Sequence, residues 1–302
     1  MYWGVFREGA PHEPEVLDSL EADAEETPSI LMWYRYWDAR PLFDDEAAEG
    51  LGRRGIVPMV TWEPWKPPQQ GGRGRNQPAY ALSRIVDGNF DRYIRRYARS
   101  VRAYGAPVML RPFHEMDGDW YPWGGTVNGN TPEDLVAAWR HIHGIFRQVG
   151  ATNVTWVWSV NHVSAPATRQ IALERYWPGS RFVDWIGISG FNWGPTRPGT
   201  TWVDFHAVYR KRYRELLRFR RPIVLTEIGA PEIGGDKAAW IRDSIEAMLR
   251  DYPRIRGFVW YDRRDDRRRD WRIDSSPRVL RAFRAVVARP DVLGAPHGYP
   301  ER

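Results

Sequence analysis

An apolar run that ends in a histidine and a glutamate decides the fold of this chain: Val108-Met109-Leu110-Arg111-Pro112-Phe113-His114-Glu115. A short apolar run that ends in polar residues is typical of a buried strand. A second run, Ile223-Val224-Leu225-Thr226-Glu227, reaches a glutamate in the same way. Two carboxylic acids at the ends of two buried strands are what cleavage of a sugar–sugar bond requires. One acid protonates the leaving oxygen, and the other meets the cationic ring carbon.

Runs of strand length recur along the whole chain and alternate with helical patterns. The predicted strands are 2–6, 29–34, 56–62, 108–113, 154–160, 185–191, 223–226 and 257–261, and the predicted helices are 44–53, 90–101, 131–150, 202–219, 236–249 and 277–288. The helices after the first strand and between 165 and 178 are poorly marked. Alternation of this kind predicts parallel pairing. Eight units predict an α/β fold, a single-domain (β/α)₈ TIM barrel over residues 1–302.

A barrel of this kind predicts where the chemistry lies. Catalytic residues of such barrels sit at the C-terminal ends of the strands. Glu115 follows the fourth predicted strand, and Glu227 follows the seventh. We therefore expect both carboxylates at the same end of the barrel.

The composition limits the class of protein. A hydrophobic content of 42% is sufficient for a packed core, and no apolar run reaches the roughly 18 residues that span a bilayer, so no membrane partner is expected. The absence of cysteine excludes disulfides, thiolate catalysis and cysteine-bound zinc. No leader segment is visible at the N-terminus. A polymeric substrate would imply work outside the cell, while the sequence leaves a cytoplasmic location open.

The net charge of +6 comes almost entirely from arginine, because only Lys66, Lys211 and Lys237 are lysines. The densest basic run, residues 263–269, is interrupted by aspartates. Mixed-sign runs of this kind are usually solvated loops. We therefore expect no nucleic-acid partner.

Seventeen tryptophans offer two interpretations. Rings that follow apolar runs could be platforms for the apolar faces of pyranose sugars, or they could pack between the layers of the fold. Two other chemistries are disfavoured. His114-Glu115 does not begin a zinc-protease motif, because Gly118 stands where the second histidine belongs, and residues 71–75 lack the Lys-Ser/Thr of a phosphate loop. We expect no metal and no cofactor.

The surroundings of each acid predict its role. Aromatic rings follow Glu115 and would desolvate it, which keeps a general acid protonated. Glu227 would be the nucleophile, and His114 would orient Glu227 or a sugar hydroxyl. Each role has a structural alternative: Glu115 could pair with Arg111, Glu227 could cap its own loop, and His114 could be a packed ring. A third acid lies in Trp62-Glu63-Pro64-Trp65, which we interpret as outer sugar subsites, with loop anchoring as the alternative.

Residues 111–123 resemble the fourth-strand signature of glycoside hydrolase family 26, in which His-Glu-Met-Asn-Gly-x-Trp-x-x-Trp carries the acid/base. A histidine before that glutamate is a trait of the family. Residues 191–194 resemble the sixth-strand end, residues 222–229 resemble the nucleophile strand, and the resemblance runs from residue 2 to about 284. It implies a (β/α)₈ barrel and a retaining double displacement on a β-linked polysaccharide, most often β-1,4-mannan.

The resemblance also implies roles for single residues. Glu115 is the acid/base, Glu227 is the nucleophile, and His114 supports the nucleophile. Trp120, Trp123 and Trp193 would contact sugar near the cleavage point. Apart from the resemblance, we also expect substrate contacts from His114, Phe191, Trp62, Trp65, His162 and Trp260. Two residues depart from the pattern: Asp117 replaces an asparagine, and Phe191 replaces a tyrosine that bonds the nucleophile, a bond that Tyr261 or His162 could supply instead.

Three functions follow from these residues. The first is an endo-acting β-glycanase, with mannan as the leading substrate. The second is the same machinery acting on β-1,3-1,4-glucan, another β-glucan or xylan. The third is an inactive barrel that binds glycan, which the presence of both acids disfavours. In each case the expected partner is a polysaccharide or oligosaccharide, and the expected oligomeric state is a monomer.

Overall fold

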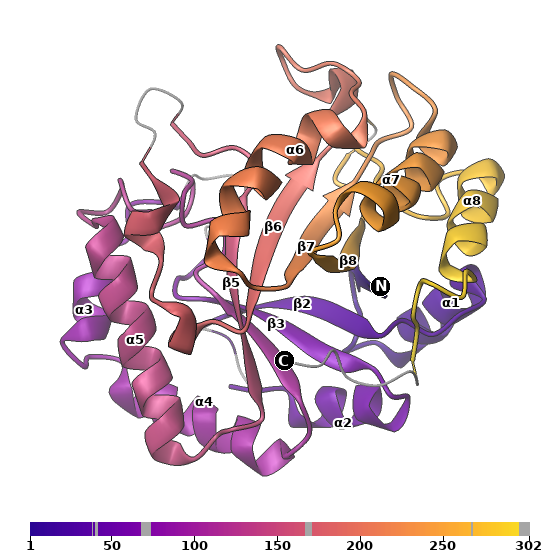
Figure 1. Ribbon diagram of the computed structural model, residues 1–302. Coiled ribbons are helices and arrows are strands. Elements are labelled where there is room, and N and C mark those ends of the chain that lie inside the picture. Colours follow the sequence, from indigo (N-terminus) through magenta and orange to yellow (C-terminus); the bar gives the residue numbers. More distant parts are fainter. Residues whose placement is uncertain (38, 40–41, 68–73, 167–170, 267, 296–302) are drawn as a thin grey trace. The chain divides into compact units, whose positions relative to one another are not determined.

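The computed structural model describes residues 1–295 except 38, 40–41, 68–73, 167–170 and 267 (Figure 1). Within this part of the chain the strands are β1 (Tyr2–Arg7), β2 (Ile30–Tyr36), β3 (Val57–Glu63), β4 (Val108–Pro112), β5 (Val154–Asn161), β6 (Trp185–Phe191), β7 (Ile223–Gly229) and β8 (Ile255–Asp262). They form a closed parallel barrel in the order β1 to β8, which confirms the predicted fold class.

Among the described residues an α-helix follows every strand except β5, and two follow β3. The helices are α1 (Pro14–Ala24), α2 (Asp45–Arg53), α3 (Leu82–Val86), α4 (Asp91–Tyr104), α5 (Pro132–Val149), α6 (Phe205–Leu216), α7 (Lys237–Asp251) and α8 (Pro277–Val287). Helix α5 illustrates how the sequence determines where a helix begins and ends. Thr131 caps it, the Asp134 carboxylate accepts from the backbone of Thr131, Pro132 occupies the first position, and Gly150 ends it in a left-handed conformation.

The segments that the sequence marked poorly differ from one another. The helix after the first strand is present as α1. Between residues 165 and 178 the described residues form only the short 3₁₀ helix η3 (Leu173–Tyr176), and residues 167–170 lie outside the described part. Of the glycine-rich segment 71–75, residues 71–73 also lie outside it.

The chain folds into two compact units. Unit 1 contains Met1–Trp33, Gly50–Pro58 and the chain from Gly187 onward, and unit 2 contains Tyr34–Glu49 and Met59–Ile186. In unit 1, β1 pairs with β8 over six residues, from Tyr2 opposite Gly257 to Arg7 opposite Asp262. In unit 2, β4 pairs with β3 and β5. The single-domain organisation remains a prediction.

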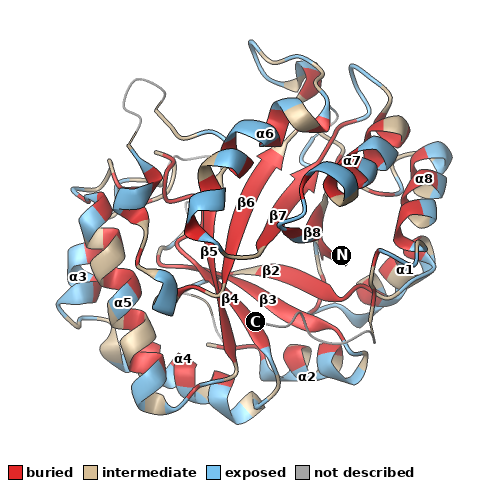
Figure 2. Cartoon of the chain, in the orientation of Figure 1, coloured by how far each residue is buried: buried red, intermediate tan, exposed pale blue. Residues whose placement is uncertain are grey.

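The strands are buried on both faces, whereas each helix buries one side and exposes the other (Figure 2). All seven residues of β3 and all seven of β7 are buried. This pattern is typical of parallel strands covered by helices, because both faces of such a strand meet other side chains. Among the described residues no helix is both long enough and apolar enough to cross a membrane.

Candidate active site

Glu115 lies just after β4, in a backbone conformation that costs free energy. Phe113 and Glu115 both have φ of +53°, in the left-handed region that side chains with a Cβ avoid. Two backbone bonds hold the turn: Glu115 N–H donates to the Ser159 carbonyl at 2.9 Å, and Gly118 N–H donates to the Glu115 carbonyl at 2.9 Å. Strain of this kind persists where the surrounding structure enforces it, and it clusters at functional sites. The left-handed backbone at Phe113 also ends β4 at Pro112, one residue earlier than predicted.

Trp120 holds the Glu115 side chain. Its indole Nε1 donates to Glu115 Oε2 at 2.7 Å, and the Glu115 residue is 8% exposed. Gly118 makes room for this ring, since a Cβ at position 118 would lie 2.5 Å from Trp120 Cζ2. The sequence assigned Trp120 a sugar contact and did not show this support of the carboxylate.

Asp117 joins the β4 loop to the segment after β5. Its two carboxylate oxygens accept from the Asn161 backbone N–H and from Ser164 Oγ, both at 2.8 Å. Its carbonyl accepts from the Ala165 N–H at 3.0 Å. The aspartate that departs from the family pattern therefore connects Glu115's loop to the segment that carries His162. His162 itself is half-buried, and its proposed sugar contact stays a prediction.

His114 is enclosed among aromatic side chains of unit 2. It is 1% exposed, and its ring lies 4.6 Å from Tyr121 and 5.5 Å from Trp123. Burial, and secondarily the nearby Arg111, holds the pKa of His114 well below its usual range. His114 is therefore neutral near pH 7, and its approach of 3.9 Å to Glu63 is no ion pair. A neutral imidazole can both donate and accept, as an orienting residue requires.

Three of the predicted sugar-binding rings lie in the interior. Trp62 and Trp123 are 0% exposed, and Trp260 is 2% exposed. Trp62 packs among Trp37, Tyr93 and Tyr97; the Trp123 indole donates to the His114 carbonyl at 2.7 Å; and Trp260 packs against Trp240 and Phe283 of helices α7 and α8. In this structure these rings have almost no surface to offer a sugar, so packing is the better account of them. The sequence could not separate the two roles, because both place tryptophan at strand ends.

Trp65 remains a partly exposed ring beside these buried ones. It meets Tyr121 and Trp123 edge-on, at 5.3 and 5.8 Å between ring centroids. Its indole Nε1 is buried without a hydrogen-bond partner within the described chain. The same is true of Trp3, Trp33, Trp37 and Trp185, so this feature alone does not mark a sugar contact.

Glu227 lies within β7, because that strand continues to Gly229 rather than ending at residue 226 as predicted. It is 7% exposed, and Ser189 Oγ of β6 lies 3.5 Å from its Oε1. Burial and, to a smaller extent, the charge of Glu227 raise the pKa of the Tyr209 phenol. Burial, followed by the charges of Asp265 and Glu227, raises the pKa of Tyr261. Both phenols therefore keep their protons beside this carboxylate at neutral pH.

An aromatic group in unit 1 includes Tyr261, the phenol whose pKa the charge of Glu227 helps to raise. The Phe191 ring lies 5.2 Å from Trp193, 5.0 Å from Trp271 and 5.4 Å from Tyr261. Phe191 and Trp193 are partly exposed, as a sugar contact requires, while Trp271 is buried beneath them. The Arg197 guanidinium lies 3.0 Å from the centre of the Trp193 ring, so one face of that ring is covered. Trp271 and Arg197 had no place in the sequence prediction.

No group of three or more histidine, aspartate or glutamate side chains within the described residues is arranged to hold a metal ion. The residues that the sequence singled out instead form an acid loop in unit 2 and a carboxylate with aromatic neighbours in unit 1. Residues 78–215, a range that includes Glu115 but ends before Glu227, match the model of glycosyl hydrolase family 26. This region of the chain belongs to the family.

Relatives with named activities differ in how much of their length this chain covers. It is 38% identical to Endoglucanase H of Acetivibrio thermocellus over 80% of the chain, which is 25% of that protein. It is 29% identical to the β-1,3-xylanase TXYA of a Vibrio species over 53% of the chain and 34% of that protein. It is 28% identical to a mannan endo-1,4-β-mannosidase of Bacillus subtilis over 60% of the chain and 44% of that protein. The chain therefore spans less than half of the length of each of these relatives.

Solved structures of the family share the barrel. A family 26 β-mannanase from Bacteroides ovatus superposes with a TM-score of 0.68 at 18% identity, over 97% of this chain and 90% of that one. An endo-β-1,4-mannanase variant from Cellulomonas fimi superposes with a TM-score of 0.72 at 16% identity, over 99% and 73% of the two chains. At these identities the likeness concerns the fold.

Proposed function

We propose that this family 26 chain is a retaining, endo-acting glycoside hydrolase of β-linked polysaccharide, with Glu115 as acid/base and Glu227 as nucleophile. The strained turn at Glu115, whose carboxylate Trp120 holds at 2.7 Å, is the observation that carries the proposal. Left-handed backbone at a glutamate is costly, and a strand end of a closed parallel barrel is where such barrels keep catalytic groups. Glu227 lies near the C-terminal end of β7 in that barrel.

The chemistry proceeds in two displacements. In the first, a Glu227 oxygen bonds to the anomeric carbon while the glycosidic oxygen leaves with the proton of Glu115. In the second, Glu115 removes a proton from water, the water oxygen bonds to the anomeric carbon, and the bond to Glu227 breaks. Two inversions leave the configuration retained. A double displacement of this kind needs the two carboxyl groups about 5 to 5.5 Å apart, which a crystal structure with bound ligand can test.

The polysaccharide has two candidate identities. Mannan is the first, because mannan endo-1,4-β-mannosidases are among the relatives over 60% of the chain. β-Glucan is the second, and one observation favours it: Endoglucanase H matches at 38% identity over 80% of the chain. Because a polysaccharide does not cross a membrane unaided, we place the activity outside the cell. We also propose that the enzyme acts as a monomer.

A substrate panel tests the activity directly. Reducing ends released from mannan, barley β-glucan, β-1,3-xylan and chitosan are measured under the same conditions. Release from mannan alone supports the first substrate, and release from barley glucan alone supports the second. Tight retention on one glycan with no release from any would indicate a glycan-binding barrel and would refute hydrolysis.

Glu227→Ala should abolish turnover of the preferred glycan, because no covalent intermediate can form without the nucleophile. Azide should restore part of the activity on an activated substrate and give a product of opposite anomeric configuration. Proton NMR of the first-formed product measures that configuration. Near-normal activity of the variant would show that another residue is the nucleophile.

Glu115→Ala should slow cleavage of natural glycan far more than cleavage of an aryl glycoside with a good leaving group. Such a leaving group needs little protonation, so the loss of the acid matters least there. The ratio of kcat/KM values for the two substrates, in the variant and in the parent enzyme, is the measurement. An equal loss on both would contradict the acid role.

A further inference from the structure

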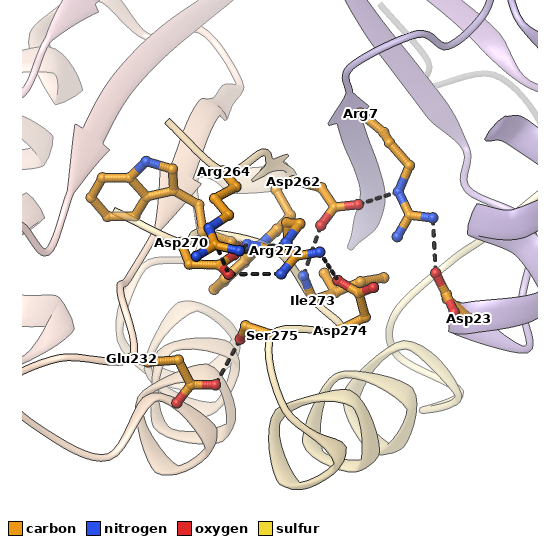
Figure 3. A network of polar contacts seen from close by, with 12 residues as sticks. Arg7, Asp23, Glu232, Asp262, Arg264, Asp270, Arg272, Ile273, Asp274 and Ser275 are labelled. Atoms are coloured by element: carbon orange, nitrogen blue, oxygen red, sulfur yellow. Dashed lines mark hydrogen bonds and ion pairs between the residues drawn. The ribbon is translucent and has the colours of Figure 1, made fainter. Parts of the chain in front are cut away.

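A buried lysine begins helix α7 in unit 1. Lys237 is 1% exposed, and its Nζ donates to the Asp270 carbonyl at 2.9 Å, the Arg272 carbonyl at 2.7 Å and Ser275 Oγ at 3.0 Å. An ammonium group has three donors, and all three are used here. The acceptors belong to the loop between β8 and α8, residues 263–276 (Figure 3).

A positive charge is energetically unfavourable at this position. Burial removes the ammonium from water, and the N-terminal end of a helix carries the positive end of its dipole. The charged groups around it are Glu232 before α7, Asp262 at the end of β8, and Asp270 and Arg272 in the loop. Arg278 at the start of α8 is paired with Asp236, the residue that caps α7. Because burying this ammonium group is unfavourable, we infer that its hydrogen bonds to the loop are structurally important.

Those bonds fix Trp271. The two carbonyls that Lys237 binds belong to the residues directly before and after this tryptophan. The Trp271 ring lies 5.0 Å from Phe191 and 5.3 Å from Trp193, the two partly exposed rings of the same aromatic group. A further link runs from the same loop, since Arg268 donates to the Pro195 carbonyl at 2.6 Å, two residues beyond Trp193.

We propose that Lys237 is a positioning residue for the sugar-contacting surface of unit 1. By binding the backbone on both sides of Trp271, it holds that ring beneath Phe191 and Trp193 and fixes the angle at which these two rings meet a sugar. The part of this inference that concerns sugar rests on the proposed function, whereas the part that concerns the loop does not.

The protonation state of Lys237 gives the inference a pH dependence. Burial lowers the pKa of Lys237 to about 8. Above that pH the neutral amine has two donors for three acceptors, so one bond to the loop is lost. The folded protein releases this proton at lower pH than the unfolded chain does, so between about pH 8 and 10.5 this group makes the fold more stable as pH rises. The expected change is confined to the loop.

Trypsin measures the loop without any substrate, because Arg263, Arg264, Arg268, Arg269 and Arg272 provide cleavage sites within it. Cleavage after these residues, mapped by mass spectrometry, should be slow in the parent protein at pH 7 and faster at pH 9.5. Lys237→Met should be cleaved quickly at both pH values. Lys211→Met, at an exposed lysine of α6, is the matched control and should behave like the parent. Rates are normalised to a peptide substrate of trypsin at each pH.

Steady-state kinetics then tests the link to sugar. Lys237→Met should raise KM for the preferred glycan with kcat nearly unchanged. Loss of hydrogen bonds to the loop predicts an increase of roughly three- to tenfold. Ser275→Ala removes one acceptor and should fall between the parent and Lys237→Met. In the parent enzyme KM should rise through a midpoint near pH 8, and this rise should be absent in Lys237→Met.

The two proposals fail in different ways. If the parent cleaves no glycan, the proposed function fails, while trypsin still tests the lysine. A loop equally resistant at pH 7 and 9.5 in the parent protein overturns the positioning role, even if Lys237→Met does not fold. A loop that opens while KM stays constant overturns the link between Lys237 and the sugar surface.

Discussion

Replacing Trp120 by phenylalanine removes one hydrogen bond of the candidate site, which the indole Nε1 donates to Glu115 Oε2. Phenylalanine keeps an aromatic face in the space beside Gly118 and has no donor. A hydrogen bond given to a carboxylate favours its ionised form. The ionised form of the acid is the inactive one in the first displacement, so the variant should keep its active protonated form to higher pH.

The geometry sets the size of this effect. A bond of 2.7 Å to an ionised group contributes about 1.5 to 3 kcal/mol, and about 1.4 kcal/mol corresponds to one pH unit. The alkaline limb of the pH profile of kcat/KM should therefore move upward by about one to two units. The peak rate should fall at the same time, because the side chain loses the contact that orients it.

The assay is the pH dependence of kcat/KM on the glycan that the substrate panel identifies. Trp139→Phe is the matched control, because it removes an indole donor of similar bond length, 2.9 Å, that binds the Phe182 carbonyl rather than Glu115. The control should keep the pH profile of the parent enzyme. An alkaline limb that stays in place in Trp120→Phe would refute the reasoning, because Trp120 would then not act on the acid.

Two further changes test the loop around Glu115. Gly118→Ala places a Cβ 2.5 Å from the Trp120 ring, so the ring must move, and the variant should reproduce the shifted pH profile of Trp120→Phe; an unshifted profile would show that the bond survives. Asp117→Asn replaces one of the two acceptor oxygens with a donor. This should lower the free energy of unfolding by about 1 kcal/mol and the melting temperature by about 2 to 4 °C. Scanning calorimetry measures that shift, and an unchanged melting temperature would show that Ser164 reverses its bond without loss.

The architecture followed from patterns that the sequence displays directly. The β6 strand occupies the predicted range 185–191, and α5 begins at the Thr-Pro pair that predicted it. Glu227 was placed after its strand because Thr226-Glu227 is polar, but β7 continues through Gly229, since both faces of that strand are covered. In a sequence pattern polar residues mark the predicted end of a strand, whereas in the folded protein burial decides where the strand ends.

The roles of the tryptophans were the weak part of the prediction. Trp62 and Trp260 lie near the ends of β3 and β8, Trp123 follows β4 and Trp193 follows β6, yet the first three are buried and Trp193 is partly exposed. The residue type is the same in both cases, and the packing of neighbouring rings distinguishes them. Support such as that of Trp120 for Glu115 depends on side-chain direction, which no spacing encodes.

The scarcity of lysine has a practical consequence for attaching this protein to a surface. Lys66 and Lys211 are exposed, whereas Lys237 is enclosed and hydrogen-bonded, so amine-reactive esters should couple through two of the three lysine side chains and the N-terminal amine. Lys66 directly follows Trp65, and Lys211 lies on α6. Lys66→Arg would therefore direct side-chain immobilisation to α6 and leave the β3 end unobstructed.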